Sequence, residues 1–192
     1  MLRVPNGRLG ASDPFVNLGD AVTIRIPPGD YPVRVTVADV SDSQDGSHLR
    51  EAYLSLVITE GTPSRVAVLT PEGREPAFDD EFYGVPVDAG TIAFADADAV
   101  SRCMPVGDWY NEVFDTGSDE SWFSLMDSDK HLVQGCANVV MPRAPSGENV
   151  VLCHSGWGDG FYPIVGTYDA EFRLMAVHID LLVDEAPEAV IH

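Results

Sequence analysis

The chain has 192 residues, and its 31 acidic against 11 basic side chains give a formal net charge of −20 at pH 7. This charge argues against binding of nucleic acid or anionic membranes, because both carry negative phosphates. No segment reaches the roughly 20 consecutive apolar residues of a membrane-spanning helix. The first residues lack the apolar core of a signal peptide. We therefore expect a cytoplasmic protein with reduced thiols, folded as one domain over residues 1–192.

The first part of the chain predicts antiparallel strands. Apolar side chains alternate with polar ones, which is typical of strands with one buried face. The segments are 21–26, 31–39, 50–58 and 64–69. A Pro-Pro-Gly-Asp turn at 27–30 separates the first two strands. The last two are predicted to form a hairpin because only Thr59 to Pro63 separate them.

The middle of the chain is acidic and has a helical pattern. Residues 72–130 contain 15 acidic and three basic side chains, so they contribute −12 of the net charge. Short helices are predicted at 96–104, 107–114 and 118–128, with Ser118 as the N-cap of the last one. We interpret 72–130 as an acidic helical insertion between two groups of strands.

Strands return after the insertion and complete the predicted fold. They are expected at 137–142, 149–155, 161–168 and 173–183. The last two are predicted to form a hairpin about Asp169-Ala170. The fold class is therefore α+β, with a largely antiparallel, sandwich-like sheet and a short acidic helical insertion. The core is expected over about 8–184, followed by a C-terminal tail at 185–192.

One short motif suggests a protease. Asp115-Thr116-Gly117 resembles the catalytic turn of pepsin-like aspartic proteases. Such a turn follows an apolar strand, and two aspartates must meet to share a proton. Here the preceding stretch 107–114 is helical in pattern, and the only similar string, Val87 to Thr91, has Ala at the third position. The motif is therefore interpreted as a turn that begins a helix.

The loop at 38–52 is a candidate cation site. It places an acidic or imidazole side chain at every third position, namely Asp39, Asp42, Asp45 and His48. Carboxylate and hydroxyl oxygens are ligands for Ca²⁺ or Mg²⁺, but Ala52 stands where an EF-hand needs Glu. Two interpretations stay open. Either Asp42, Asp45 and His48 bind a divalent cation, or the Asp and Ser side chains only stabilise turns.

Two further segments carry candidate site residues. The loop 151–166 alternates Gly with Trp157 and Asp159 after His154 and Ser155, which indicates a tight loop. It matches neither the nucleophile elbow nor a phosphate loop. On the strand 173–183, period-two alternation puts His178 and Asp180 on one face. They are interpreted either as an oriented base or ligand pair, or as a solvent-facing pair.

Several blocks of sequence together resemble the bacterial family DUF4241. They are ADVSDSQDGSHLREAYLSLVI, VDAGTIAFAD, FDTGSDESWFSLMD, and ENVVLCHSGWGDGFYPIVGTYD followed by AVHIDLLV. The resemblance covers about residues 8–184. It implies no activity, cofactor or catalytic residue. It marks the loops 39–50, 88–91 and 154–160 and the strand segment 178–180 as family blocks.

The sequence thus predicts a non-catalytic binding protein with a polar site. The site residues are Asp39, Asp42, Asp45, His48, His154, Ser155, Trp157, Asp159, His178 and Asp180. One alternative is a metal-assisted hydrolase that uses the same loops with a divalent cation as cofactor. Another is an acidic inhibitor or immunity-like protein whose partner is a basic protein. The expected partner is a small polar ligand or a basic protein, and the oligomeric state is left open.

Overall fold

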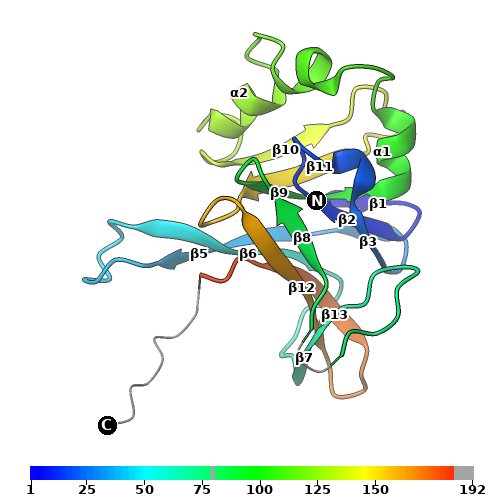
Figure 1. Cartoon of the computed structure of the whole chain (residues 1–192), viewed down its shortest axis with the longest axis vertical. Helices are drawn as coiled ribbons and strands as arrows, with labels where there is room; N and C mark the ends of the chain where they lie inside the picture. Colours follow the sequence, from blue (N-terminus) through cyan, green and yellow to red (C-terminus); the bar gives the residue numbers. More distant parts are fainter. Residues whose placement is uncertain (79–80, 184–192) are drawn as a thin grey trace.

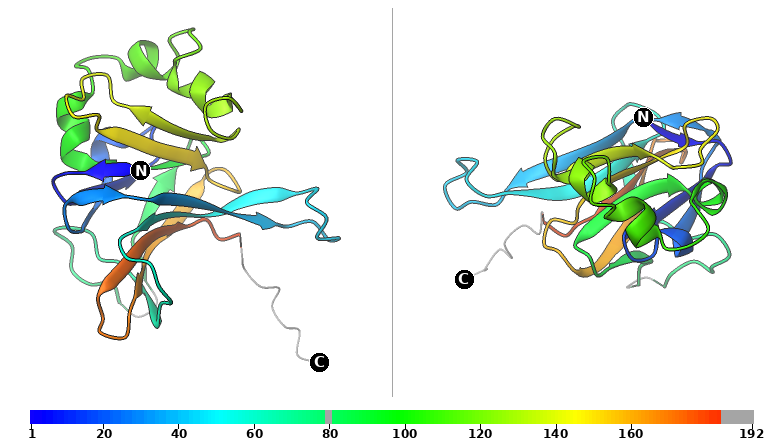
Figure 2. Two further views of the ribbon diagram at one scale, coloured as in Figure 1. Left: turned by 180° about the vertical axis from the view of Figure 1, so that it is seen from behind. Right: turned by 90° about the horizontal axis from the view of Figure 1, so that it is seen from above.

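The computed structural model describes residues 1–78 and 81–183, so the predicted tail 185–192 lies outside the described residues. The described chain has three layers: a six-stranded sheet, a five-stranded sheet packed against it, and a layer of short helices (Figures 1 and 2). The predicted α+β class with sandwich-like antiparallel sheets is confirmed. All strand pairs within the described residues are antiparallel.

The five-stranded sheet lies in the middle of the molecule. Its strands, in spatial order, are β10 (Cys136–Val140), β11 (Asn149–His154), β9 (Thr91–Asp96), β2 (Arg8–Ser12) and β3 (Val22–Arg25). Beside it, β1 (Leu2–Val4) pairs with β4 (Gly29–Tyr31). All six residues of β9 are buried, because this strand is covered on one face by the other sheet and on the other face by the helices.

The six-stranded sheet forms the outer layer. Its path runs β5 (Val33–Asp39), β6 (Leu49–Val57), β13 (Leu174–Asp180), β12 (Gly160–Tyr168) and β7 (Arg65–Val68), and β8 (Gly84–Val87) pairs with the first part of β12. The hairpin predicted about Asp169-Ala170 is confirmed, since β12 pairs with β13. The hairpin predicted between 50–58 and 64–69 is wrong. Both edges of β6 are taken by β5 and β13, so β7 pairs with β12 instead.

Two hydrophobic clusters hold the layers together. The larger lies between the sheets and includes Phe94, Leu54 and Ile179, which are fully buried. The smaller lies under the helices and contains aromatic side chains packed on the alanines of β9, for example Trp122 on the side of Ala93. Small residues on that face of β9 leave room for the aromatic rings, and so the helices pack close to the sheet.

The helices lie within the stretch predicted as an acidic insertion. They are α1 (Ala97–Cys103), a single π-helical turn (Tyr110–Phe114) and α2 (Trp122–Asp127). The same stretch also contains β8 and β9, which belong to the sheets. The N-cap of α2 is Ser121, whose hydroxyl accepts from the Ser124 N–H, and not Ser118 as predicted. Ser118 instead contacts the Thr116 hydroxyl in the preceding turn.

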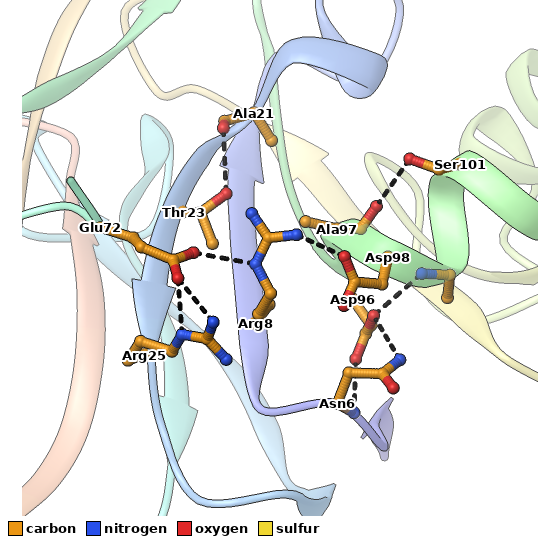
Figure 3. A network of polar contacts seen from close by, with 11 residues as sticks. Asn6, Arg8, Ala21, Thr23, Arg25, Glu72, Asp96, Ala97, Asp98 and Ser101 are labelled. Atoms are coloured by element: carbon orange, nitrogen blue, oxygen red, sulfur yellow. Dashed lines mark hydrogen bonds and ion pairs between the residues drawn. The ribbon is translucent and has the colours of Figure 1, made fainter.

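A polar network joins the N-terminal strands to α1 (Figure 3). The buried Asp96 carboxylate accepts from the Ala99 N–H at the start of α1 and from both the backbone and side chain of Asn6. Nearby, Arg8 pairs with Glu72 and Asp98. The hydrogen bond to Glu72 is the main cause of the raised pKa of Arg8. These ion pairs are partly exposed, so solvent screening weakens their contribution to stability.

Candidate functional site

A pocket with several polar side chains lies on the outer face of the six-stranded sheet. Along β13 the side chains of Val177 and Ile179 are buried in the core, so His178 and Asp180 point to the other face. There they line a pocket of about 310 Å³. Its lining is Thr36, Tyr53, Ser55, Val66, Val165, Thr167, His178 and Asp180. The pocket thus draws residues from β5, β6, β7, β12 and β13.

His178 occupies the centre of this pocket. The strand register places it between Ser55 of β6 and Val165 of β12. Its Nδ1 lies 2.7 Å from the Ser55 Oγ, and its Nε2 lies 3.2 Å from the Thr167 Oγ1. A hydroxyl can donate or accept, so the two hydroxyls satisfy a neutral imidazole in either tautomer. Burial lowers the pKa of His178, and the nearby charge of Asp180 acts in the opposite direction.

The charge of the pocket limits what it can bind. Asp180 is its one acidic residue, and the lining includes no Lys or Arg among the described residues. The Asp180 Oδ1 already accepts the Leu182 N–H at 2.9 Å. Val66 and Val165 supply an apolar wall, and the Tyr53 ring meets His178 edge-on at 6.4 Å between centroids. Such a surface suits a neutral or cationic group joined to an apolar body.

The lowered pKa of His178 predicts a specific pH dependence of stability. The unfolded chain binds the proton more readily than the folded one, because an unfolded histidine has a pKa of about 6.5. The contribution of neutral His178 to the free energy of unfolding is therefore complete above about pH 6.5. It is lost as the pH falls through the lower pKa that His178 has in the folded state. His178→Asn should lose less stability than the wild type between about pH 7.5 and 5 in urea titrations. A ¹H NMR titration of His178 with a midpoint at or above 6.5 would contradict this.

The Asp-rich loop is held together by its own turns. The Asp39 carboxylate accepts from the Ser41 hydroxyl at 2.6 Å, the Gly46 N–H at 2.7 Å and the Ser41 N–H at 3.0 Å. The Ser41 hydroxyl bond is the main cause of the lowered pKa of Asp39. Asp45 likewise accepts the Ser47 N–H at 3.0 Å. These contacts favour the interpretation of the loop as a set of stabilised turns.

The proposed cation ligands of this loop are not assembled into a metal centre. Asp42, Asp45 and His48 are all exposed. Within residues 1–78 and 81–183, no group of three or more His, Cys, Asp or Glu side chains is arranged to hold a metal ion. The loop geometry therefore gives no support to a divalent cation at these three residues.

The Gly-rich loop joins two other family blocks. The buried Ser155 donates its hydroxyl to the Gly158 carbonyl at 2.6 Å and its N–H to the Gly90 carbonyl at 3.0 Å. Trp157 is 53% exposed. The Arg50 guanidinium lies 5.5 Å from the centroid of the Trp157 ring, and the His48 ring meets it edge-on at 6.2 Å. The loop 154–160 thus contacts the loop 88–91 through Ser155 and the loop 39–50 through Trp157.

The structure places the ten predicted site residues in different parts of the fold. His178 and Asp180 line the pocket on the sheet, and its lining contains none of the other eight. His48, Ser155 and Trp157 belong to the loop contacts described above. His154 and Asp159 are exposed, and the His154 N–H continues the β10–β11 pairing through the Gly135 carbonyl.

Sequence reasoning missed four polar residues of the pocket. They are Thr36, Tyr53, Ser55 and Thr167. A signal was present in β6, where Tyr53 and Ser55 alternate with the buried Leu54 and Leu56. Which of these residues meets His178 depends on the cross-strand register, and a single strand does not reveal it.

The Asp-Thr-Gly string is a surface turn. Asp115 is exposed and follows the π-helical turn, and its carboxylate accepts the Tyr110 hydroxyl at 3.4 Å. In the other candidate string, the Asp88 N–H donates to the buried Asp13. Asp115 follows a π-helical turn rather than a strand, and the string that follows β8 has Ala at its third position. Both strings are therefore interpreted as structural turns.

The fold and the pocket define an acidic α+β protein with antiparallel sheets and a pocket around His178 on its outer sheet. No helix of the described chain is long and apolar enough to cross a membrane. The sequence model described as "Protein of unknown function (DUF4241)" matches residues 2–179, and the chain belongs to this family. Searches of curated proteins and of solved structures gave no match.

Proposed function

We propose that this protein binds a small ligand with an apolar body and one neutral or cationic hydrogen-bonding end, in the pocket around His178. The observation that carries the proposal is the arrangement of His178 between the hydroxyls of Ser55 and Thr167 at the floor of that pocket. A half-buried imidazole that stays neutral can donate to or accept from a ligand without the cost of burying a charge.

The size and composition of the pocket support a small molecule. Its volume of about 310 Å³ lies at the lower end of ligand sites, which span about 300–1,000 Å³. Ligand sites combine an apolar wall with a few converging polar groups. Here Val66 and Val165 provide the wall, while His178 and Asp180 provide the polar end. The single carboxylate disfavours an anionic ligand.

Binding explains the geometry better than acyl-transfer catalysis does. The 2.7 Å contact between Ser55 and His178 is within the range of a nucleophile and its base. However, acyl transfer also needs N–H donors aimed at the developing oxyanion. The N–H groups of β6, β12 and β13 point within the plane of the sheet, where these strands pair with their neighbours. The metal-assisted alternative has no assembled ligand group at Asp42, Asp45 and His48 in the described chain.

The inhibitor alternative depends on the acidic surface. Seven carboxylates between Asp108 and Asp129 are exposed, and none forms an ion pair within the described residues. They are distributed over the π-helical turn, α2 and the connecting loops. A surface of this kind most often keeps a protein soluble, so it supports a defined partner less directly than the pocket supports a ligand.

Saturation-transfer NMR with three probes tests the proposal. Benzylamine and benzyl alcohol represent cationic and neutral ligands, and benzoate is the anionic control. We expect the first two, but not benzoate, to bind weakly and to shift the His178 ring signals. Val66→Trp should abolish binding, because Val66 is 62% exposed at the pocket and a larger ring there fills it.

The matched control is Val140→Trp. Val140 is 59% exposed and is the last residue of β10 in the five-stranded sheet, and it does not line the pocket. This variant should bind the probes like the wild type. Binding that survives Val66→Trp, or that does not affect His178, would place the probes elsewhere and defeat the proposal. Preferential binding of benzoate would contradict the ligand class.

A further inference from the structure

We propose that Cys136 and Cys153 are a redox modification site that forms a reversible intrachain disulfide when the protein meets a peroxide. Both residues are free thiols in the structure. They are direct partners in the pairing of β10 with β11. The inference is independent of the ligand pocket around His178, which lies on the other sheet.

The hydrogen bonds between β10 and β11 show whether Cys136 and Cys153 form a hydrogen-bonded or a non-hydrogen-bonded pair. The neighbouring residue pair in this ladder is Gly135 and His154. It is joined by a hydrogen bond from the His154 N–H to the Gly135 carbonyl at 3.1 Å. In an antiparallel ladder the two kinds of pair alternate, so Cys136 and Cys153 form a non-hydrogen-bonded pair. Such pairs have Cα atoms about 4.5 Å apart and closely spaced side chains. Disulfides span Cα distances of about 4.4–6.8 Å, so the backbone already permits the bond.

Both thiols lie on the same face of the sheet. Cys153 is fully buried in the cluster between the two sheets, and Cys136 packs against that cluster from its edge. The third cysteine, Cys103, is buried in the separate cluster under the helices. The register therefore selects one pair out of the three that the sequence allows.

An oxidant can reach the pair through Cys136. This residue is half-buried and lines an open groove of about 380 Å³ together with Val33, Leu132 and Val133. Leu132 and Val133 are themselves 55% and 60% exposed. A small neutral oxidant such as hydrogen peroxide can enter an apolar groove, whereas a charged disulfide such as oxidised glutathione is disfavoured there.

The chemistry is a two-electron oxidation. The Cys136 thiolate attacks one peroxide oxygen, the O–O bond breaks, and a sulfenic acid and hydroxide form. The Cys153 sulfur, after losing its proton, then attacks the Cys136 sulfur and releases the second oxygen as water. In total, two thiols and one peroxide give one disulfide and two waters. Added dithiol reverses the reaction.

The surroundings make this reaction slow. Burial, with a contribution from Glu51, raises the pKa of Cys136 to about 11, and burial raises the pKa of Cys153 well above its usual value. Little thiolate is therefore present near neutral pH. We expect the site to respond to sustained rather than brief exposure to peroxide, with faster cross-linking in alkaline solution.

The test uses the native, full-length protein in excess hydrogen peroxide. After the peroxide is removed, the protein is denatured and labelled with N-ethylmaleimide. The reduced protein should take up three labels and the oxidised protein one. Trypsin should release Cys103, Cys136 and Cys153 in separate peptides, because it cleaves after Arg102, Lys130 and Arg143. The expected product is a cross-link between the peptides 131–143 and 144–173, and the melting temperature should rise.

Variants distinguish this bond from unspecific oxidation. Cys103→Ser should give the same cross-link and leave no labelled thiol after oxidation. Cys136→Ser should give no cross-link, and it places a polar hydroxyl only at a half-buried position. The proposal is overturned by three remaining labels, by cross-links that include Cys103, or by oxygen addition to Cys136 without a cross-link. In denaturant the cross-link should lose its selectivity for one pair. A native product distributed over the three cysteines as in denaturant would also overturn the proposal, because the folded register would then play no part.

Discussion

Replacing Asp13 by alanine is expected to lower the free energy of unfolding by about 3–5 kcal/mol, one of the largest effects of any single change in this chain. Asp13 is fully buried. Its carboxylate accepts from the Ala89 N–H at 2.7 Å, the Thr91 hydroxyl at 2.8 Å, the Asp88 N–H at 3.0 Å and the Phe15 N–H at 3.2 Å. Alanine removes the acceptor and leaves buried donors without a partner, each at a cost of about 1–3 kcal/mol.

Urea unfolding followed by circular dichroism measures this effect. Asp20→Ala is the matched control, because Asp20 is exposed and its loss should change stability by less than about 0.5 kcal/mol. Asp13→Asn should fall between the two, since an amide keeps one acceptor oxygen but places an N–H₂ group against donors. A loss below about 1 kcal/mol for Asp13→Ala would show that water or a shift of the loop replaces the carboxylate.

The role of Asp13 extends to the family blocks. By holding Asp88 and Ala89 it fixes the turn that contains Gly90, and the Gly90 carbonyl accepts the Ser155 N–H. Asp13 therefore supports the Gly-rich loop indirectly, through the turn at 88–90, although Asp13 is far from that loop in the sequence. Sequence reasoning did not select Asp13, because an isolated aspartate after a short strand gives no local signal of burial.

Strands with one open face could be predicted from local patterns, while the central strand β9 of the five-stranded sheet could not. In β6 and β13 one face is buried and the other is open, so apolar and polar residues alternate and the strands are recognisable. In β9 both faces are buried, and the string Thr-Ile-Ala-Phe-Ala-Asp has no alternation. It was therefore included in the acidic stretch predicted as helical.

The sequence indicates which residues share a face of one strand, but it does not indicate which residues of other strands lie beside them. Period-two alternation puts His178 and Asp180 on one face, and both line the pocket. Their partners follow from the register of β6 and β12, and the bulge between Thr36 and Val37 also shifts which β5 side chains reach the pocket. In the Asp-rich loop, the same residues satisfy both a cation-site pattern and a turn pattern. Only the hydrogen bonds of Asp39 and Asp45 distinguish the turn interpretation from the cation-site interpretation.

The second large effect is expected at Gly156, where alanine should cost about 3 kcal/mol or more. Gly156 has a φ of +70°, and a Cβ there would lie 2.5 Å from the Glu51 carbonyl oxygen and 3.0 Å from a Val183 methyl. Left-handed backbone alone costs an L-residue roughly 1–2 kcal/mol. The contact with Glu51 adds to this, because a backbone carbonyl of β6 cannot move aside like a flexible side chain.

Gly158, two residues further along the same loop, separates the two contributions. Its φ is +94°, yet a Cβ there would meet nothing within 4 Å. Gly158→Ala should therefore cost only the backbone term of about 1–2 kcal/mol. Urea unfolding of both variants should show Gly156→Ala as the clearly less stable one. Equal losses would mean that β6 does not hold the loop in place, and that Trp157 is positioned by the turn conformation alone.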